Sequence, residues 1–367
     1  MNPRLEIVTI AAFVAAACAL PGTFLVLRRV ALMSDAISHS ILPGIVIGFF
    51  LVGDRSHPLV IAGAALSGVL AVTLTEGLLK TRRVDKDAAI GLVFPVLFSI
   101  GVILITRYAS GVHLDVDAVL LGELAFAPFN RATYFGLDLP VGIWVMGAIL
   151  LLNVIAILLF YKELKLATFD PGLAAALGFA PTLIHYGLMT LVSVTAVGAF
   201  DHVGSILVVA LMIAPPAAAY LLTNSLSRML VISVVLGVLA AFGGYLVASW
   251  IDTSIAGAMA TMSGVIFMIT LLFAPEQGLI ARKRLSRKRR ERFAVEMLLV
   301  HLSRHENTAT EAAENAMPHL TGELNWSPEF AGATVERAGQ QGLIEKHGDQ
   351  LRLTPKGRAT AERVLMR

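Results

Sequence analysis

The sequence predicts an all-α polytopic membrane protein of about nine transmembrane helices that ends in a small α+β winged-helix domain. Two observations support this prediction. Of the 367 residues, 56% are hydrophobic and only 15% are charged, whereas a soluble domain carries about 25% charged residues. The charged residues are also concentrated, because residues 281–367 hold 27 of the 55 in the chain. A long apolar part is therefore followed by a short polar part.

The distribution of charge divides the chain into three predicted segments. Residues 1–280 hold 13 basic and 15 acidic residues and form the transmembrane domain. Residues 281–292 hold eight basic residues and one acid, and residues 293–367 hold eight basic residues and ten acids. We interpret 281–292 as a juxtamembrane linker that binds anionic lipid headgroups, with a nucleic-acid-binding arm as the alternative. Residues 293–367 are expected to form the winged-helix-like cytoplasmic domain.

Apolar runs of about 20 residues, the length that crosses a ~30 Å hydrocarbon layer as a helix, recur along the first domain. They lie near 7–27, 58–79, 88–106, 140–160, 181–200, 203–223, 229–249 and 254–274. The run Ile41–Gly53 is too short, and we extend it back through Ala31–Ser40 because Arg28 and Arg29 end the first span. This gives nine spans, with eight as the alternative count. The semi-apolar segment 107–139 is expected to hold a short helix or to dip into the membrane.

Basic residues in the short loops predict the orientation. With nine spans, one side of the membrane receives Arg28, Arg29, Lys80, Arg82, Arg83, Lys86, Lys162, Lys165 and the tail from Arg282. We assign this side to the cytoplasm, so in a bacterial cytoplasmic (inner) membrane the N-terminus lies outside and the C-terminus inside. External loops are then expected at 54–57, 107–139, 201–202 and 250–253. Because the chain begins without a basic n-region or a cleavage site, its first apolar run is expected to be a retained span.

The polar tail predicts three helices, a pair of short strands and a last helix. Phe293–Ser303 has helical periodicity. Ser327 and Pro328 are typical of an N-cap and a first helical position, and Gly342 is expected to end that helix. The strands and the final helix are expected at 343–346, at 350–354 and from 355 onward. This order is the outline of a winged-helix domain.

The sharpest motif is Ser34-Asp35-Ala36-Ile37-Ser38-His39-Ser40 in the second predicted span. Asp35 and His39 are four residues apart, so a helix places both on one face. A carboxylate and an imidazole suit a borderline divalent cation, and an ionisable residue inside a span by default marks a substrate path. The alternative is a satisfied polar pair between packed helices. Two ligands are too few for a closed site, so a second span, a second protomer or water must supply the rest.

Other acidic and histidine residues are weaker metal candidates. Asp87 is expected in the first turn of a span, where the helix dipole favours an acid. Solvated positions at external span ends are the alternative for Asp201, His202 and Asp252. We interpret His57 and His113 as surface residues, His185 as a core histidine, and His301 and His305 as an exposed polar face of a tail helix.

Phe169–Gly178 predicts a short helix on the cytoplasmic side between two spans. Asp170 is the expected N-cap, Pro171 the first helical residue and Gly178 the C-cap. A capped helix of small residues is suited to docking in a groove of another protein, and an ordinary connecting helix is the alternative. The sequence contains no G-x-x-x-x-G-K-[ST] motif, so ATP-driven transport would need an ATPase on another polypeptide.

Together these motifs resemble the zinc/manganese/iron permease family of ATP-binding cassette (ABC) importers over roughly residues 5–275. The ordered set consists of Leu27-Arg28-Arg29, Met33–His39, Asp87–Gly91, Asp117 to Gly122-Glu123, Asp170 to Gly178, Val203–Pro215 and Asp252-Thr253. The resemblance implies a membrane permease for inward transport of divalent metal ions, with no permanently bound cofactor. It implies that the metal site is Asp35 and His39. It also implies a coupling helix, carrying Asp170, Ala174 and Gly178, that meets the ATPase.

The resemblance implies partners as well: a second copy of the chain or a paralogous permease, cytoplasmic ATP-binding subunits, and an extracytoplasmic metal-binding protein. The amino-acid sequence of Ser38–Gly44 is closer to that of manganese and iron members of the family than to that of zinc members, so manganese is the favoured ion. The family usually has glycine where this chain has Ser34, a departure that affects the local packing.

The tail resembles the DNA-binding half of iron- and manganese-dependent repressors at Gln341–Ile344 and Leu353–Arg358. Residues 293–367 carry a net charge of −2, whereas a DNA-binding domain presents a basic face. We therefore expect an interaction or regulatory module, with no nucleic-acid partner. Two rival functions stay open, an ATP-independent metal transporter and a membrane-tethered, metal-responsive regulator.

Overall fold

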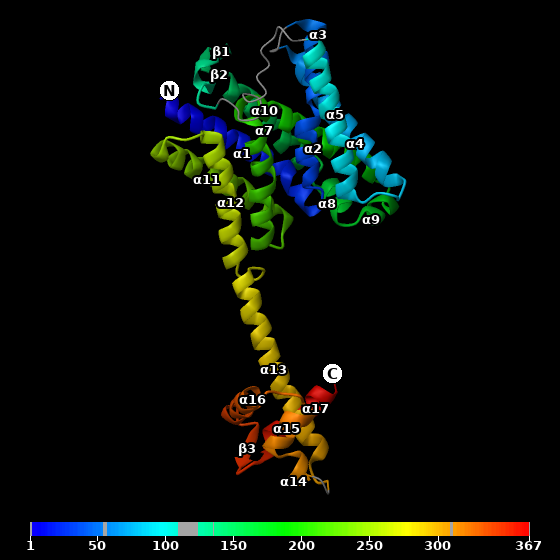
Figure 1. The fold of residues 1–367 in the computed structure, drawn as a ribbon, viewed down its shortest axis with the longest axis vertical. Helices are drawn as coiled ribbons and strands as arrows, with labels where there is room; N and C mark the ends of the chain where they lie inside the picture. The colour runs from blue at the N-terminus through cyan, green and yellow to red at the C-terminus, as the bar shows by residue number, and fades with distance from the viewer. Residues whose placement is uncertain (1, 54–56, 109–123, 135, 309–310, 367) are drawn as a thin grey trace. The chain divides into compact units, whose positions relative to one another are not determined.

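The computed structural model describes residues 2–366 except 54–56, 109–123, 135 and 309–310. Two compact units make up the chain, Met1–Gly278 and Leu279–Arg367. Figure 1 labels their helices and strands. The helix or membrane dip predicted within 107–139 falls largely on residues outside the described part, as do His113, Asp117, Gly122 and Glu123.

Helices dominate the first unit. They are α1 (Pro3–Leu27), α2 (Leu32–Ser40), α3 (Leu42–Val52), α4 (Pro58–Lys80), α5 (Lys86–Tyr108), α7 (Val141–Leu159), α8 (Tyr161–Phe169), α9 (Pro171–Ala176), α10 (Pro181–Leu222), α11 (Leu226–Ile251) and α12 (Ile255–Phe273). Eight helical stretches in the described residues are long and apolar enough to cross a membrane, namely α1, α2 with α3, α4, α5, α7, α10, α11 and α12. The prediction of a helical, polytopic membrane protein is confirmed.

Helix α10 is interrupted at Gly204. Its 42 residues would reach about 63 Å as one straight helix, roughly twice the hydrocarbon thickness. Gly204 has φ 76° and ψ 163°, a conformation that is essentially reserved for glycine. The chain therefore turns at Gly204 and not in the loop predicted at 201–202, because Asp201 and His202 still lie in the helix before the break.

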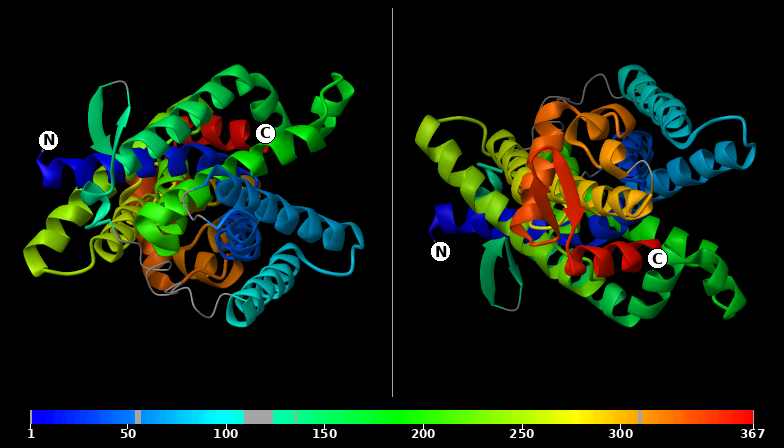
Figure 2. Two further views of the ribbon diagram at one scale, coloured as in Figure 1. Left: turned by 90° about the horizontal axis from the view of Figure 1, so that it is seen from above. Right: turned by 90° about the horizontal axis from the view of Figure 1, so that it is seen from below.

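Helix α1 lies at the centre of the first unit. It packs against α7, α10 and α11, and Figure 2 shows it crossing the unit between α7 and α11. Glycines let neighbouring helices approach closely. A Cβ atom on Gly44 of α3 would lie only 2.6 Å from the carbonyl carbon of Gly63 and 2.8 Å from the Cβ of Ser67, both on α4. The α3–α4 contact thus requires glycine.

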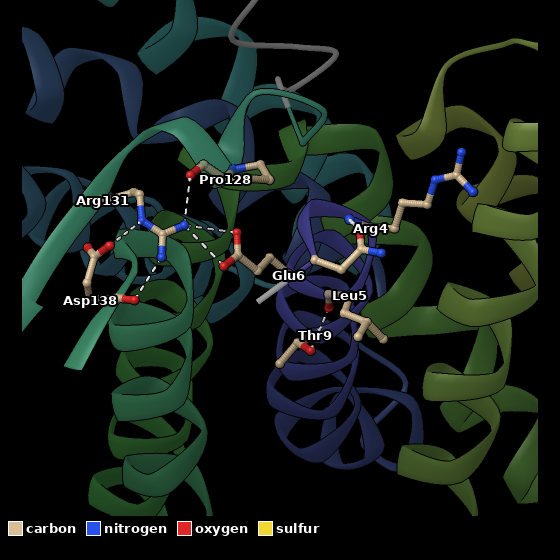
Figure 3. A network of polar contacts seen from close by, with 8 residues as sticks. Arg4, Leu5, Glu6, Thr9, Pro128, Arg131 and Asp138 are labelled. Carbon is tan, nitrogen blue, oxygen red and sulfur yellow. Dashed lines mark hydrogen bonds and ion pairs between the residues drawn. The ribbon is translucent and has the colours of Figure 1, made fainter.

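A short hairpin caps the end of α1 that carries the N-terminus. Strands β1 (Arg131–Tyr134) and β2 (Leu137–Pro140) pair antiparallel after the 3₁₀ turn η1 (Ala127–Phe129). Figure 3 shows the Arg131 guanidinium pointing at Glu6 of α1. It donates to both Glu6 carboxylate oxygens at 3.1 Å and to the Asp138 carboxylate at 2.9 Å. The hydrogen bonds to Glu6 and then Asp138 raise the pKa of Arg131, so the guanidinium stays charged.

The second unit begins with the long helix α13. Its elements are α13 (Leu279–His305), α14 (Glu311–Glu314), α15 (Met317–Glu323), α16 (Pro328–Gln340), β3 (Ile344–His347), β4 (Gln350–Leu353) and α17 (Pro355–Leu365). The predicted basic linker 281–292 lies inside α13 and is helical. An apolar core joins these elements through Leu298, Leu299, Leu302, Leu320, Leu351 and Ala361.

The ends of the tail elements follow the sequence. The Ser327 hydroxyl accepts from the backbone N–H of Phe330 at 3.3 Å, and Gly342 adopts φ 66° after α16. Strands β3 and β4 pair antiparallel, with Ile344 opposite Leu353. The predicted helix start, strand pair and last helix are present. The assignment of these elements to a winged-helix domain stays a prediction.

One expectation for the tail is wrong. His301 and His305 were expected to form an exposed polar face of their helix. The His301 side chain is instead buried, with 8% of its surface exposed, and its Nε2 lies 3.1 Å from the Glu314 carbonyl oxygen. The reason is tertiary, because α14 packs against α13, and the His319 ring of α15 lies with its centroid 6.2 Å from that of His301.

Candidate functional site

The structure brings Asp35 and His39 together on α2. The Nε2 atom of His39 lies 3.5 Å from the Asp35 Oδ1 atom. The side chain of His39 is 28% exposed and that of Asp35 is 41% exposed. On α5, the rings of Phe94 and Phe98 both lie with their centroids 5.9 Å from the His39 ring. The pair is thus partly open and has an aromatic wall on one side.

Serine hydroxyls connect α2 to α10 and α4 and form one hydrogen bond within α2. Ser34 is fully buried and its hydroxyl donates to the sulfur of Met212 on α10 at 3.1 Å. The Ser38 hydroxyl donates to the Ser34 carbonyl at 2.9 Å, and Ser67 of α4 donates to the Ser40 carbonyl at 2.6 Å. The serine at position 34, where the resembling family usually has glycine, is therefore accommodated with a partner for its hydroxyl.

The weaker candidates lie at other places in the first unit. Asp87 is exposed in the first turn of α5, seven residues before Phe94, or about 10 Å along the helix axis. Asp201 is exposed and His202 is buried, two to three residues before the Gly204 break. Asp252 is the left-handed C-cap of α11, with φ 52°. Among the metal candidates predicted from the sequence, Asp35 and His39 are the pair for which a side-chain approach of 3.5 Å is observed in the described residues.

Asp252 lines an open cavity of about 410 Å³. The other walls come from α1, from Leu124–Phe126, from the end of α11 and from the start of α12, including Ile7, Tyr245 and Ser254. These segments belong to the side that the charge pattern predicts to be external. The lining of the cavity is mixed polar and apolar.

A polar cluster that the motifs did not reveal lies at the other end of α1. The Nε2 atom of His185 on α10 lies 2.6 Å from the Oε1 atom of Glu76 on α4. The Nδ1 atom of the same ring lies 3.1 Å from the Arg28 guanidinium. Arg28 also donates to the Thr168 hydroxyl at 3.1 Å, and burial lowers the pKa of Arg28. Lys86 donates to the Arg28 carbonyl at 3.4 Å. Glu76 could have been found as an ionisable residue within an apolar run, but its partners come from distant segments.

The predicted coupling segment forms the short helix α9. The Asp170 carboxylate accepts from the backbone N–H of Leu173 at 2.9 Å, as an N-cap does. Ala174 is fully buried, and Gly178 adopts φ 87° after the helix. Exposed apolar side chains surround these residues: Phe169 is 60% exposed, Leu173 47% and Leu177 61%.

The chain is similar to proteins of one transport family. Residues 5–274 match the model of the ABC 3 transport family. The zinc transport system membrane protein TroD of Treponema pallidum (strain Nichols) is 49% identical over 358 residues, which cover 98% of this chain and 98% of that protein. The manganese transport system membrane protein MntD of Bacillus subtilis (strain 168) is 48% identical over 278 residues, which cover 76% of this chain and 94% of that protein.

A solved structure has a similar fold. It is described as PsaBC from Streptococcus pneumoniae in complex with Fab, and it superposes with a TM-score of 0.64 at 28% sequence identity. The match covers 77% of this chain and 96% of that one. The matched 77% of the chain is close to the share of the chain that the first unit, Met1–Gly278, makes up.

Proposed function

Since the chain belongs to the ABC 3 transport family, we propose that it is the membrane permease subunit of an ABC importer for divalent transition metal ions. The family model covers residues 5–274, and the two relatives that are 49% and 48% identical over the aligned residues are named as zinc and manganese transport system membrane proteins. Permease subunits of this kind have no ATPase site of their own. ATP is hydrolysed by separate cytoplasmic subunits.

The transported ion binds at Asp35 and His39. The observation that supports this assignment is the 3.5 Å approach of a carboxylate and an imidazole inside an apolar helical stretch. The carboxylate supplies a hard oxygen ligand and the imidazole a nitrogen ligand, a combination that borderline divalent ions accept. Two ligands leave about two positions open on a tetrahedral ion and about four on an octahedral one. Water or a second protomer fills them, which suits an ion that must leave again.

Exposure of the pair favours a dimeric permease. A charged carboxylate facing lipid at the centre of a helix costs about 2.5–3.5 kcal/mol on insertion scales. The Asp35 side chain is 41% exposed in the single chain. A second copy of the chain, or a paralogous permease, covers this face or encloses a water-filled ion path there.

Manganese is the ion we favour, with zinc and iron as alternatives. The amino-acid sequence of Ser38–Gly44 resembles that of manganese and iron members of the family, and a carboxylate ligand suits Mn²⁺. The two relatives with nearly equal identity are named for zinc and for manganese. An uptake assay with competing metals decides between them.

We place the ATPase contact at α9. The helix is capped by Asp170, and Phe169, Leu173 and Leu177 present apolar surface next to it. Exposed apolar patches of this kind mark interaction sites. Movement of the ATP-binding subunits is then transmitted through Asp170–Gly178 to α8 and α10, which pack against α9.

The topology we propose has nine crossings, with the two halves of α10 counted separately. The N-terminus lies outside, the cavity near Asp252 faces an extracytoplasmic metal-binding protein, and the C-terminus lies in the cytoplasm. The transmembrane domain comprises 1–280, and 281–292 lies along the membrane surface. Residues 293–367 form a winged-helix-like module for interaction or regulation, and their net charge of −2 argues against nucleic acid.

The test is metal uptake by cells that express the permease with its partner subunits. Asp35→Ala and His39→Ala should each abolish uptake of radioactive manganese, while Leu32→Ala, on the same helix and 49% exposed, should transport normally. Membrane content of each variant is measured by immunoblotting. If both site variants transport like the unaltered protein, the site assignment is wrong. If uptake persists when the ATPase subunit is inactivated, the importer is not ATP-driven.

A further inference from the structure

A second group of metal-ligand side chains lies in the second unit. His301, His305 and Glu314 each offer a ligand atom, and these three atoms lie within 4.8 Å of one another. The group falls outside residues 5–274, which match the transport family. The proposed transport function therefore does not use these residues.

The local structure explains why the three side chains meet. His301 and His305 are four residues apart on α13, so they share one face, and their ring centroids are 4.8 Å apart. Two histidines at this spacing on a helix are an arrangement that binds zinc in other proteins. Glu314 is the last residue of the short helix α14, which packs against α13.

Surrounding groups orient the ligands. The His301 Nε2 atom lies 3.1 Å from the Glu314 backbone carbonyl oxygen. A carbonyl oxygen only accepts, so this contact assigns the proton to Nε2 and leaves the lone pair on Nδ1. His319 of α15 places its Nε2 atom 2.5 Å from the Glu314 Oε2 atom. The first contact is a hydrogen bond and the second an ion pair. Metal-binding histidines and carboxylates usually have polar partners of this kind, which fix the tautomer and the side-chain direction.

We propose that His301, His305 and Glu314 bind a divalent transition metal ion, with His319 as the positioning residue for Glu314. Two imidazoles and one carboxylate suit Zn²⁺ better than Mn²⁺. Ligand distances of about 2.0–2.2 Å around a tetrahedral ion place neighbouring ligand atoms about 3.3 Å apart. The ligand atoms, now within 4.8 Å of one another, need to close by at most about 1.5 Å to reach this separation, which side-chain rotation supplies. Water occupies the fourth position.

A competing explanation is a metal-free polar cluster in which the histidines only satisfy Glu314. The two explanations differ in what the cluster does with added metal. A metal site loses affinity steeply when a ligand is removed, whereas a polar cluster is indifferent to metal. Binding of the ion also ties α13 to α14, so the stability of the folded unit should rise with the logarithm of the metal concentration above the Kd.

The experiment uses the full-length chain in lipid nanodiscs after removal of bound metal, titrated with Zn²⁺ against a chromophoric chelator and with Co²⁺ as a spectroscopic probe. We expect a tight site that gives the strong visible absorption of tetrahedral Co²⁺. His305→Ala and Glu314→Gln should abolish this absorption and weaken Zn²⁺ binding by more than 100-fold, beyond the ~10–100-fold that loss of an outer partner causes. The matched control is His347→Ala, because His347 is an exposed histidine on β3 of the same unit.

Two further variants complete the test. A chain with both Asp35→Ala and His39→Ala should keep the Co²⁺ absorption, which separates this site from the transport site. His319→Ala should weaken Zn²⁺ binding about 10–100-fold, and His319→Gln should restore part of it by donating to Glu314. Hydrogen exchange of the metal-free variants checks that the tail is folded. The proposal is overturned if His305→Ala and Glu314→Gln, folded by this measure, bind Zn²⁺ and Co²⁺ like the unaltered chain, or if only the Asp35/His39 variant loses the absorption.

Discussion

The close approach of α3 and α4 at Gly44 should make the permease sensitive to a single methyl group. In Gly44→Ala the new Cβ would lie 2.6 Å from the Gly63 carbonyl carbon and 2.8 Å from the Ser67 Cβ, whereas ordinary van der Waals contact begins at 3.4 Å. The Gly63 neighbour is backbone and cannot rotate away. The two helices must therefore separate, and overpacking of this kind costs about 1–3 kcal/mol.

That cost should also reach the transport site. Ile41, between α2 and α3, has φ −73° and ψ −20°, so the two helices are nearly continuous and a shift of α3 displaces His39. At 1.4 kcal/mol per factor of ten, a cost of 1–3 kcal/mol changes the population of the native packing by roughly 5- to 140-fold. We expect Gly44→Ala to lower the unfolding temperature in detergent and to reduce metal uptake per unit of protein in the membrane.

The control is Gly264→Ala in α12, where an added Cβ meets nothing within 4 Å. This change should be neutral or stabilising by about 0.5–1 kcal/mol, since alanine is the better helix former. Unfolding is followed by intrinsic fluorescence on heating, and uptake with radioactive metal. Equal unfolding temperatures and equal uptake in the two variants would refute the close packing of α3 on α4.

Three further predictions concern other contacts. Arg131→Ala should lower the unfolding temperature, because it removes the guanidinium that contacts both oxygens of the buried Glu6 carboxylate. The double variant Arg131→Ala/Glu6→Gln should be more stable than Arg131→Ala alone. A double variant that is less stable than Arg131→Ala would contradict this explanation. Asp170→Ala should weaken the cap of α9 by about 1 kcal/mol and reduce the ATPase activity of the reconstituted importer. Asp170→Asn keeps the side-chain acceptor and should retain this activity. Equal ATPase activities of the two variants would refute a role of the cap in coupling. Ser34→Gly should transport normally at a stability cost of about 0.5–1 kcal/mol, and loss of uptake would show that the hydroxyl is needed.

Much of the site was predictable because it depends on local spacing. Asp35 and His39 are four residues apart, and any helix through them brings the pair onto one face. The caps at Asp170 and Ser327 were equally local, since an N-cap bonds to a backbone N–H two or three residues later. These features require only the sequence within one turn of helix.

Other parts of the site could not be read from spacing. Glu76, His185 and Arg28 come from three different helices, and their contact depends on how α1, α4 and α10 pack. The break predicted at 201–202 is observed at Gly204, because glycine permits a backbone conformation that the preceding residues avoid. The sequence predicts an exposed face at His301, whereas the side chain is buried and contacts α14 and His319 of α15.

The sequence by itself determined the membrane class, the approximate spans, the polar tail and the Asp35–His39 pair. Hydrophobic run length, charge placement and the helical repeat are properties of neighbouring residues, so they can be recognised in the sequence alone. Only the tertiary structure decided what surrounds those residues: the Phe94 and Phe98 wall at His39, and the meeting of His301 and His305 with Glu314. Contacts of this kind join separate helices, and their geometry is set by packing that no local pattern encodes.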